Sequence, residues 1–402
     1  MKLEKAAPKN VLYLASGASF RSDKPGRKIH SVVKCFKDMG YWVRFIAGGD
    51  ILPGGNAGRG GAKALGRKGA GYKIHLPDAL YHSISEYRDM KRDRLFSRYL
   101  RLKLKDYKPD LIWERSWRLQ KAGLELAADL GIPYILEWKD HLTNYPISLF
   151  KGKAESLETR KLKKARWVVV ESTKLKNVIS KEEGLDPDKF LVALNGVDID
   201  EFGNVPRGDH SRNKLSLPQE AFVVGYVGSF AWYHDIELLV QTAAFLKYNN
   251  LLDSFLFVMV GDGGTKAKVE QIAEDRGLES HFRFTGRVPM EDVPHYLAAF
   301  DCAVLPGCTD IICPIKVSEY MAAGLAVVIP DYEPNREIIF SGENGLLFVP
   351  KDARSMSEKM LYLKNNPESK DRIGNQARET AAENLTWEGT WGTALKKILE
   401  EV

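Results

Sequence analysis

The stretch "PIKVSEYMAAGLAVVIP", residues 314–330, joins a short helix to an apolar strand. Ala and Met favour the helix, and "AVVIP" (326–330) is a continuous apolar run of the kind that forms a buried parallel strand. Lys316 falls in the first helical turn, where the partial positive charge of the helix end disfavours a cation. An anion bound at this end would remove that penalty. The stretch therefore predicts a helix–strand unit that carries an anion site.

Short apolar strands alternate with helical segments on both sides of this unit. Helical stretches such as 123–131 and 268–277 lie between the strands. This alternation is typical of parallel sheets covered by helices on both faces. It predicts an α/β protein with two Rossmann-like, doubly wound parallel sheets. The expected strands are 11–16, 42–47, 111–113, 134–138, 167–172 and 190–194 in the first half, and 223–229, 255–261, 282–286, 302–306, 326–330 and 345–349 in the second.

A polar segment rich in Gly, Pro and Asn, residues 195–218, separates the two sets of strands. The 402 residues are enough for two domains of ordinary size. We therefore place a first domain at 1–200 and a second at 201–386.

The composition, 44% hydrophobic and 28% charged, is that of a globular protein. No apolar run approaches the roughly 20 residues that span a bilayer, and the N-terminus lacks the hydrophobic centre of a signal peptide. We therefore expect a cytoplasmic protein. Cys302, Cys308 and Cys313 cluster, but their spacing fits no common zinc pattern, which favours buried or loop thiols.

Charge is distributed unevenly along the chain. Residues 1–200 carry 39 Lys and Arg against 24 Asp and Glu, a net +15, whereas residues 201–402 carry 20 against 29, a net −9. Such asymmetry predicts that the first half meets an anionic partner. Two basic tracts contribute, the Gly-rich loop 54–73 and the helical tract 87–108.

The tract 87–108 has three interpretations: a solvated face, a nucleic-acid contact or a membrane contact. Nucleic acid is disfavoured because the tract matches no nucleic-acid-reading motif. Leu95, Phe96, Tyr99 and Leu102 are interleaved with its cations. We favour an anionic membrane surface or a lipid phosphate as its partner, at the inner face of the membrane.

Four loops follow strands of the second sheet, and the carboxyl ends of parallel strands meet at one edge, where such sheets bind ligands. They are "SFAWYHD" (229–235), "DGGTKAK" (262–268), "RVPMEDV" (287–293) and "GCTDIICPIK" (307–316). Together they supply glycines, helix starts, His234, Arg287 and Lys316, which is the chemistry of a phosphate-binding site. A diphosphate is the anion that best accounts for Lys316.

Glu319, one turn beyond Lys316, can accept hydrogen bonds from sugar hydroxyls. The alternative is that Lys316 and Glu319 form an i,i+3 ion pair on a solvent-exposed face, worth a few tenths of a kcal/mol. Residue composition alone leaves both interpretations open.

Other motifs carry less weight. "DID" (198–200) has the form of a metal–diphosphate motif, but turn formation and capping by Asp are favoured there. No P-loop and no G-x-G-x-x-G motif occurs, which argues against P-loop NTPases and dinucleotide-dependent dehydrogenases. His141 is interpreted as structural or solvent-facing. Asp140 follows a strand expected in the centre of the first sheet, and it is a candidate catalytic residue.

Several longer segments resemble glycosyltransferases of the GT-B, family-4 type. "VVVESTKLKNVISKEEGLDPDKFLVALNGVDIDEF" (168–202) is similar to the family's hinge, and "GYVGSFAWYHDIELL" (225–239) to the first loop of its donor domain. Residues 258–306 run in register with the family, and 314–330 are similar to its "PxKxxEYMAxGxPVV" signature. Residues 109–138 also resemble some members.

The resemblance implies a GT-B fold in which the second domain binds a nucleotide-sugar and the first binds the acceptor. It implies a hexosyl-type transferase that retains the anomeric configuration, needs no metal or other cofactor, and uses a saccharide or lipid-linked acceptor. The last helix, 387–402, would cross back onto the first domain. Implied catalytic residues are Lys316, Glu319, Asp310 and Asp140; implied donor contacts are Gly228, Ser229, His234, Gly261, Arg287, Val288, Ile315, Lys316 and Glu319; and implied acceptor-side residues are Gly17, Arg27 and Lys139.

The sequence departs from the family at several contacts. Ile311 replaces a glutamate that touches the donor sugar, Ser229 and His234 replace an arginine and a lysine beside the diphosphate, and Lys139 replaces a histidine. These changes keep a second hypothesis open, a non-catalytic GT-B partner subunit of a glycosyltransferase. A GT-B nucleotide-sugar epimerase ranks lower, because its site is rich in histidine.

Overall fold

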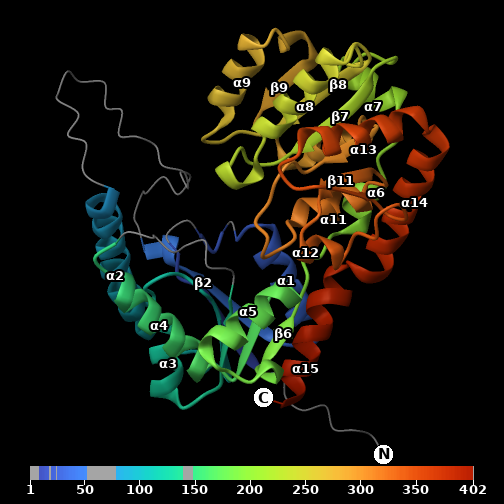
Figure 1. Cartoon of the computed structure of the whole chain (residues 1–402). Coiled ribbons are helices and arrows are strands. Elements are labelled where there is room, and N and C mark those ends of the chain that lie inside the picture. The colour runs from blue at the N-terminus through green and yellow to red at the C-terminus, as the bar shows by residue number, and fades with distance from the viewer. Residues whose placement is uncertain (1–8, 18–19, 24, 52–77, 139–147, 402) are drawn as a thin grey trace, which may run out of the picture. The chain divides into compact units, whose positions relative to one another are not determined.

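The structure is a computed structural model that describes residues 9–17, 20–23, 25–51, 78–138 and 148–401 (Figure 1). It divides into two compact units, Met1–Ala193 with Trp391–Val402, and Leu194–Thr390. The sequence analysis placed this boundary at residue 200, a few residues later. The end of the chain, including the last helix, belongs to the first unit.

The first unit is built on a six-stranded parallel sheet in the order β2-β1-β3-β4-β5-β6. Its strands are continuous buried runs such as "VLYLA" and "WVVV", as expected for a sheet covered on both faces. Its elements are β1 (Asn10–Ala15), α1 (Arg27–Asp38), β2 (Trp42–Ala47), η1 (Gly48–Ile51), α2 (Asp78–Lys103), β3 (Leu111–Arg115), α3 (Ala122–Leu130), β4 (Tyr134–Glu137), α4 (Lys151–Lys164), β5 (Trp167–Val170), α5 (Thr173–Glu183), η3 (Pro187–Lys189), β6 (Phe190–Val192) and α15 (Thr393–Glu401).

The second unit has its own six-stranded parallel sheet, in the order β12-β11-β10-β7-β8-β9. Its elements are α6 (Ile199–Gly203), α7 (Asp209–Lys214), β7 (Phe222–Val227), η4 (Trp232–His234), α8 (Glu237–Tyr248), β8 (Phe255–Val260), α9 (Lys266–Asp275), η5 (Glu279–His281), β9 (Phe282–Gly286), η6 (Met290–Asp292), α10 (Val293–Ala298), β10 (Cys302–Val304), α11 (Ile315–Ala322), β11 (Ala326–Pro330), α12 (Glu333–Arg336), β12 (Leu346–Phe348), α13 (Ala353–Asn365) and α14 (Pro367–Asn384). The π-helical turn η7 (Glu388–Gly392) contains the boundary between the two units.

The order of the strands locates the ligand-binding edge of each sheet. In the second unit the chain starts at β7 and extends outward on both sides, so the direction reverses between β7 and β10. In the first unit the reversal lies between β1 and β3. Open parallel sheets bind ligands beside such a reversal, at the carboxyl ends of the strands. The loops after β7 and β10 are therefore where a second-unit site is expected.

Helix α11 is fixed to this edge by a buried tyrosine. The hydroxyl of Tyr320 donates to the carbonyl of Val227 and accepts from its amide, both at 2.9 Å. Val317 and Met321 of the same helix are fully buried in the core of the unit. The start of α11 is consequently held in register with the end of β7.

The end of the chain completes the core of the first unit. Trp391, at the start of the last helical segment, is fully buried, and its ring centre lies 6.3 Å from that of Trp113 on β3. Lys28 of α1 covers the Trp391 ring, 4.3 Å from its centre. The first unit thus depends on residues from both ends of the sequence.

Several sequence interpretations are decided by local geometry. Asp198 accepts hydrogen bonds from the amides of Asp200 and Glu201, so "DID" caps α6, as favoured. The four cysteines lie within the described residues, are buried and form no disulfide. The basic loop 54–73 lies outside the described residues.

Phe96, expected among lipid-facing residues, is only 1% exposed, because it faces the core beneath α2; that expectation is wrong. No helix within the described segments is long and apolar enough to span a bilayer.

Candidate active site

Two glycines bring the loops after β7 and β8 into close contact at the predicted edge of the second sheet. A side chain on Gly261 would lie 1.8 Å from the carbonyl oxygen of Gly228, and Gly261 has a φ of +134°. A side chain on Gly228 would lie 2.4 Å from the Nζ atom of Lys316. Glycine at 261 therefore lets the two loops meet, and glycine at 228 leaves room for the lysine.

Lys316 extends from the first turn of α11 into this edge. Its side chain is 7% exposed, and Nζ lies 3.0 Å from the Tyr226 hydroxyl and 3.0 Å from Nε2 of His234. The Tyr226 hydroxyl in turn donates to the carbonyl of Ser229 at 2.7 Å, so it accepts from the ammonium. The ammonium also lies over the Tyr226 ring, 4.7 Å from its centre. The lysine is thus directed by Tyr226 of β7 and by His234 in the loop that follows β7.

His234 is neutral, and its tautomer follows from its partners. Its Nδ1 atom lies 3.2 Å from the carbonyl oxygen of Gly307, which can only accept, so Nδ1 carries the proton. Nε2 is therefore an acceptor for the Lys316 ammonium. Burial, and then the charge of Lys316, lower the pKa of His234 to about 3, despite the opposing hydrogen bond to Gly307. The sequence analysis named His234 as an implied donor contact; here its neutral ring accepts from the Lys316 ammonium and so positions the lysine.

Burial also lowers the pKa of Lys316, to about 7, against a smaller opposing effect of Glu319. The charge on Lys316 is therefore held in a place that disfavours it until an anion arrives. The alternative interpretation, an ion pair between Lys316 and Glu319 on a solvent-exposed face, is excluded by this burial.

The loop after β10 is held in place by side-chain amides. Asn335 donates to the carbonyl of Pro330 at 2.7 Å and to the sulfur of Cys308 at 3.5 Å. Asn195 donates to the carbonyl of Cys313 at 3.1 Å, and its own carbonyl accepts from Ser318 of α11 at 3.2 Å. The loop that delivers Lys316 is therefore fixed at both ends.

The start of α11 offers backbone donors beside the ammonium. Pro314 precedes the helix, and within the described chain no side chain caps it. Val317 donates to the carbonyl of Pro314 at 3.0 Å, so the amides of this first turn that are open to a ligand are those of Ile315 and Lys316. Two N–H groups and the helix dipole favour an anion there.

The other implied second-unit residues lie around this edge. Glu319 is half-buried one turn into α11. Ser229, Arg287 and Asp310, in the loops after β7, β9 and β10, are exposed, and Gly228, Gly261, Val288 and Ile315 are partly buried. Ile311 follows Asp310 in the same loop.

A buried cluster of charges occupies the carboxyl edge of the first sheet. Glu137, at the end of β4, is 1% exposed; it accepts from the Tyr13 hydroxyl at 2.6 Å and pairs with Arg115 at the end of β3. Lys28 lies 2.5 Å from Glu171, which follows β5. Burial alone would raise the pKa of Glu137, but Arg115 and Lys28 hold it below its ordinary value. The sequence analysis did not select these residues, although a charge at the end of an apolar strand is a usable signal.

A second buried carboxyl group lies on the same edge. Burial raises the pKa of Glu114 to about 7, and its carboxylate accepts from Ser16 at 3.2 Å and from Tyr134 at 2.5 Å. The cluster and Glu114 together place buried, hydrogen-bonded charges at the carboxyl ends of β3 to β5.

The acceptor-side residues lie partly within the described structure. Gly17 is buried just after β1, and a side chain there would lie 2.9 Å from the Trp117 ring, so glycine allows the loops after β1 and β3 to meet. Arg27 is the first residue of α1 and is half-buried. Lys139 and Asp140 lie outside the described residues.

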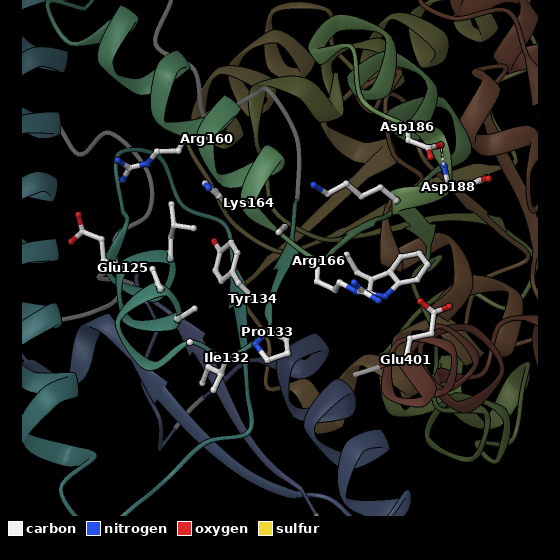
Figure 2. A pocket seen from close by; sticks show the side chains of 17 residues that line it. Glu125, Ile132, Pro133, Tyr134, Arg160, Lys164, Arg166, Asp186, Asp188 and Glu401 are labelled. Carbon is white, nitrogen blue, oxygen red and sulfur yellow. Dashed lines mark hydrogen bonds between the residues drawn. The ribbon is translucent and has the colours of Figure 1, made fainter.

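Other concave regions lie in the first unit. An open cavity of about 1160 Å³ is found at the amino ends of β4 and β5, on the opposite edge of the sheet from Glu137; Figure 2 shows Arg160, Lys164 and Arg166 among its lining residues. In the part of the chain that the structure describes, no three His, Cys, Asp or Glu side chains are grouped to hold a metal ion.

Sequence comparison identifies the family of the chain. The family model described as "Glycosyl transferases group 1" matches residues 209–380, and the model "Glycosyltransferase Family 4" matches residues 26–201. The first match covers all six strands of the second sheet, and the second covers β2 to β6 of the first sheet. The chain belongs to the family-4 glycosyltransferases. Its two parallel-sheet units are those of the GT-B fold, as the resemblance implied.

Relatives of this glycosyltransferase include the Escherichia coli UDP-Gal:α-D-GlcNAc-diphosphoundecaprenol α-1,3-galactosyltransferase. The two are 26% identical over 289 residues, which cover 69% of this chain and 70% of the relative. The Anabaena protein HepE, crystallised with UDP, is 16% identical with a TM-score of 0.69, covering 98% of this chain and 100% of that one. A Thermosynechococcus elongatus sucrose-phosphate synthase is 17% identical with a TM-score of 0.75, covering 98% of each chain. Both structures show the same fold.

The hydroxyl of Tyr226 favours the charged form of Lys316 by accepting its hydrogen bond. We therefore expect Tyr226→Phe to lower the pKa of Lys316 further below its ordinary value, measured by an NMR titration of the protein with ¹³C-labelled lysine. Tyr248→Phe is a control, because Tyr248 is 87% exposed on α8. An unchanged Lys316 pKa in Tyr226→Phe would contradict this account of the site.

Proposed function

We propose that this glycosyltransferase takes a sugar from a nucleoside-diphosphate donor held by the second unit and passes it to a hydroxyl of a saccharide or lipid-linked acceptor. The observation that carries the proposal is the buried Lys316 ammonium beside the free amides of α11. A diphosphate supplies the negative charge that would balance the ammonium. Support comes from the HepE structures, which contain UDP or UDP-glucose, and from the E. coli relative, whose name gives a UDP-sugar and a lipid diphosphate acceptor.

The proposed chemistry is electrostatic. As the bond between the anomeric carbon and the diphosphate breaks, negative charge grows on the leaving phosphate oxygen, and Lys316 with the amides of Ile315 and Lys316 stabilises it. The acceptor oxygen forms the new bond on the same face, which retains the anomeric configuration, and its proton passes to the leaving phosphate. Glu319 binds hydroxyls of the donor. Since Lys316 supplies the positive charge, the proposal assigns no step to a metal ion.

His234 and Tyr226 are proposed as positioning residues. They hold the ammonium at the rim of the sheet without adding charge of their own. A second candidate function, a partner subunit that binds a nucleotide-sugar without turning it over, is favoured by the departures at Ser229, His234 and Ile311. An epimerase is the third candidate and would release an altered nucleotide-sugar instead of a free nucleotide.

A panel of nucleotide-sugars with and without an acceptor extract distinguishes these functions. We expect nucleotide release that depends on the acceptor, persists in EDTA and falls about 100-fold in kcat/KM in Lys316→Ala, a loss of about 2.7 kcal/mol. Lys214→Ala, at the exposed end of α7, is the matched control and should keep the wild-type rate. Donor binding without turnover supports the subunit; failure to bind any donor refutes both.

A peripheral position at an anionic membrane is the second part of the proposal. On α2, Leu95 and Leu102 are 48% and 63% exposed, and Arg98 lies exposed between them. Such a combination suits a lipid interface, with leucines entering the headgroup region and cations meeting anionic lipids.

Replacing the two leucines tests this position. We expect Leu95→Ser/Leu102→Ser to bind vesicles of phosphatidylcholine with phosphatidylglycerol about tenfold more weakly than wild type in a flotation assay, because two apolar contacts are lost. Leu130→Ser/Leu149→Ser removes exposed leucines elsewhere and should not change binding. Equal recovery of wild type with neutral and anionic vesicles would rule the membrane position out.

A further inference from the structure

A second, smaller pocket of about 300 Å³ lies between α2 and α4, two helices that Figure 1 shows side by side. Its base is apolar, formed by Met90, Leu119 and Leu157. Leu119 belongs to the loop that follows the carboxyl end of β3, and it has a φ of +59°, which strains a leucine. The pocket is therefore built on a strained loop at the edge of the sheet where ligands bind.

The rim of this pocket is basic. Arg94 comes from α2, Lys121 from the start of α3, and Lys153 and Arg160 from one face of α4. Lys121 pairs with Glu125. Among the described residues, Arg94, Lys153 and Arg160 take part in no hydrogen bond or ion pair. Three unpaired cations around one small concavity repel one another, and a bound anion removes that repulsion.

The acidic side chain in the pocket lining, Asp93, already accepts backbone hydrogen bonds. Asp93 is 3% exposed and accepts hydrogen bonds from the amides of Lys121 and Ala122, both at 3.2 Å, at the start of α3. It therefore fixes the helix start, and as one carboxyl group it leaves the three rim cations in excess.

The larger cavity at the opposite edge of the sheet is a useful contrast. Its four cations are matched by four carboxylates, Glu125, Asp186, Asp188 and Glu401, so its charge is balanced (Figure 2). Arg160 lines both cavities. Of these two cavities, only the α2–α4 pocket has an excess of positive charge.

We propose that the α2–α4 pocket binds the phosphoryl group of an organophosphate, with its oxygens on Arg94, Lys153 and Arg160 and its carbon skeleton on the apolar base. A phosphomonoester carries nearly two negative charges and three acceptor oxygens, and arginine can bind two of them at once. The phosphoryl group belongs either to a membrane lipid or to a soluble phosphorylated compound. This site is separate from Lys316 and does not require the chain to transfer a sugar.

The test uses the full chain and two probes. Glycerol 3-phosphate is titrated calorimetrically with UDP present, and again into Lys316→Ala, so that a phosphate bound at the donor site is recognised. Vesicles of phosphatidylcholine with phosphatidic acid supply the lipid-borne phosphoryl group. The test variant is Arg94→Gln/Lys153→Gln. The control Arg88→Gln/Lys163→Gln removes equal charge from exposed positions of the same two helices, outside the pocket and outside the surface of Leu95, Arg98 and Leu102.

We expect the test variant to bind the preferred probe at least about tenfold more weakly than wild type. The control should change binding of glycerol 3-phosphate less than about twofold, and it should weaken vesicle binding less than the test variant does. Pocket-dependent binding of glycerol 3-phosphate assigns a soluble ligand; pocket-dependent binding of vesicles alone assigns a lipid. The inference is overturned if neither probe binds, if both variants lose binding equally, or if Lys316→Ala abolishes the binding that the test variant keeps. Because the test measures binding, its result is independent of whether the protein turns over a donor.

Discussion

The site depends on one buried ammonium group. Lys316 is placed at the amino end of α11, where the helix dipole and the low exposure both act against its charge. Tyr226 and a neutral His234 hold it there through lone pairs rather than opposite charge. A site arranged in this way is incomplete without an anion, and the free amides of Ile315 and Lys316 add donors for the same ligand.

Several contacts of the second unit hold this lysine in place. Tyr320 locks α11 to the end of β7, Asn335 and Asn195 hold the loop that precedes the helix, and Gly228 leaves room for the ammonium. These contacts lie at the carboxyl ends of β7, β10 and β11, at and beside the reversal of strand order between β7 and β10. The topology therefore explains why residues far apart in sequence converge on one atom.

The sequence predicted the strands well, because runs such as "AVVIP" are apolar throughout and lie between turn residues. It also predicted Lys316, whose place in a first helical turn is anomalous. It missed Tyr226, since a tyrosine inside "VVGYVG" looks like any buried strand residue. The tautomer of His234 depends on the carbonyl of Gly307, 73 residues away, which no local pattern indicates. The sequence analysis placed this helix at 87–108, whereas α2 spans Asp78–Lys103. The difference arises because the many cations of the segment obscure its helical period.

Proton uptake on ligand binding tests the role of Lys316 most directly. With a pKa of about 7, the lysine is mostly neutral at about pH 8, and a bound diphosphate raises that pKa, so binding draws in a proton. Calorimetric titration with UDP at this pH in two buffers of different ionisation enthalpy should show uptake of close to one proton by wild type and none by Lys316→Met. UDP binding without proton uptake, or equal uptake in both proteins, would contradict the account.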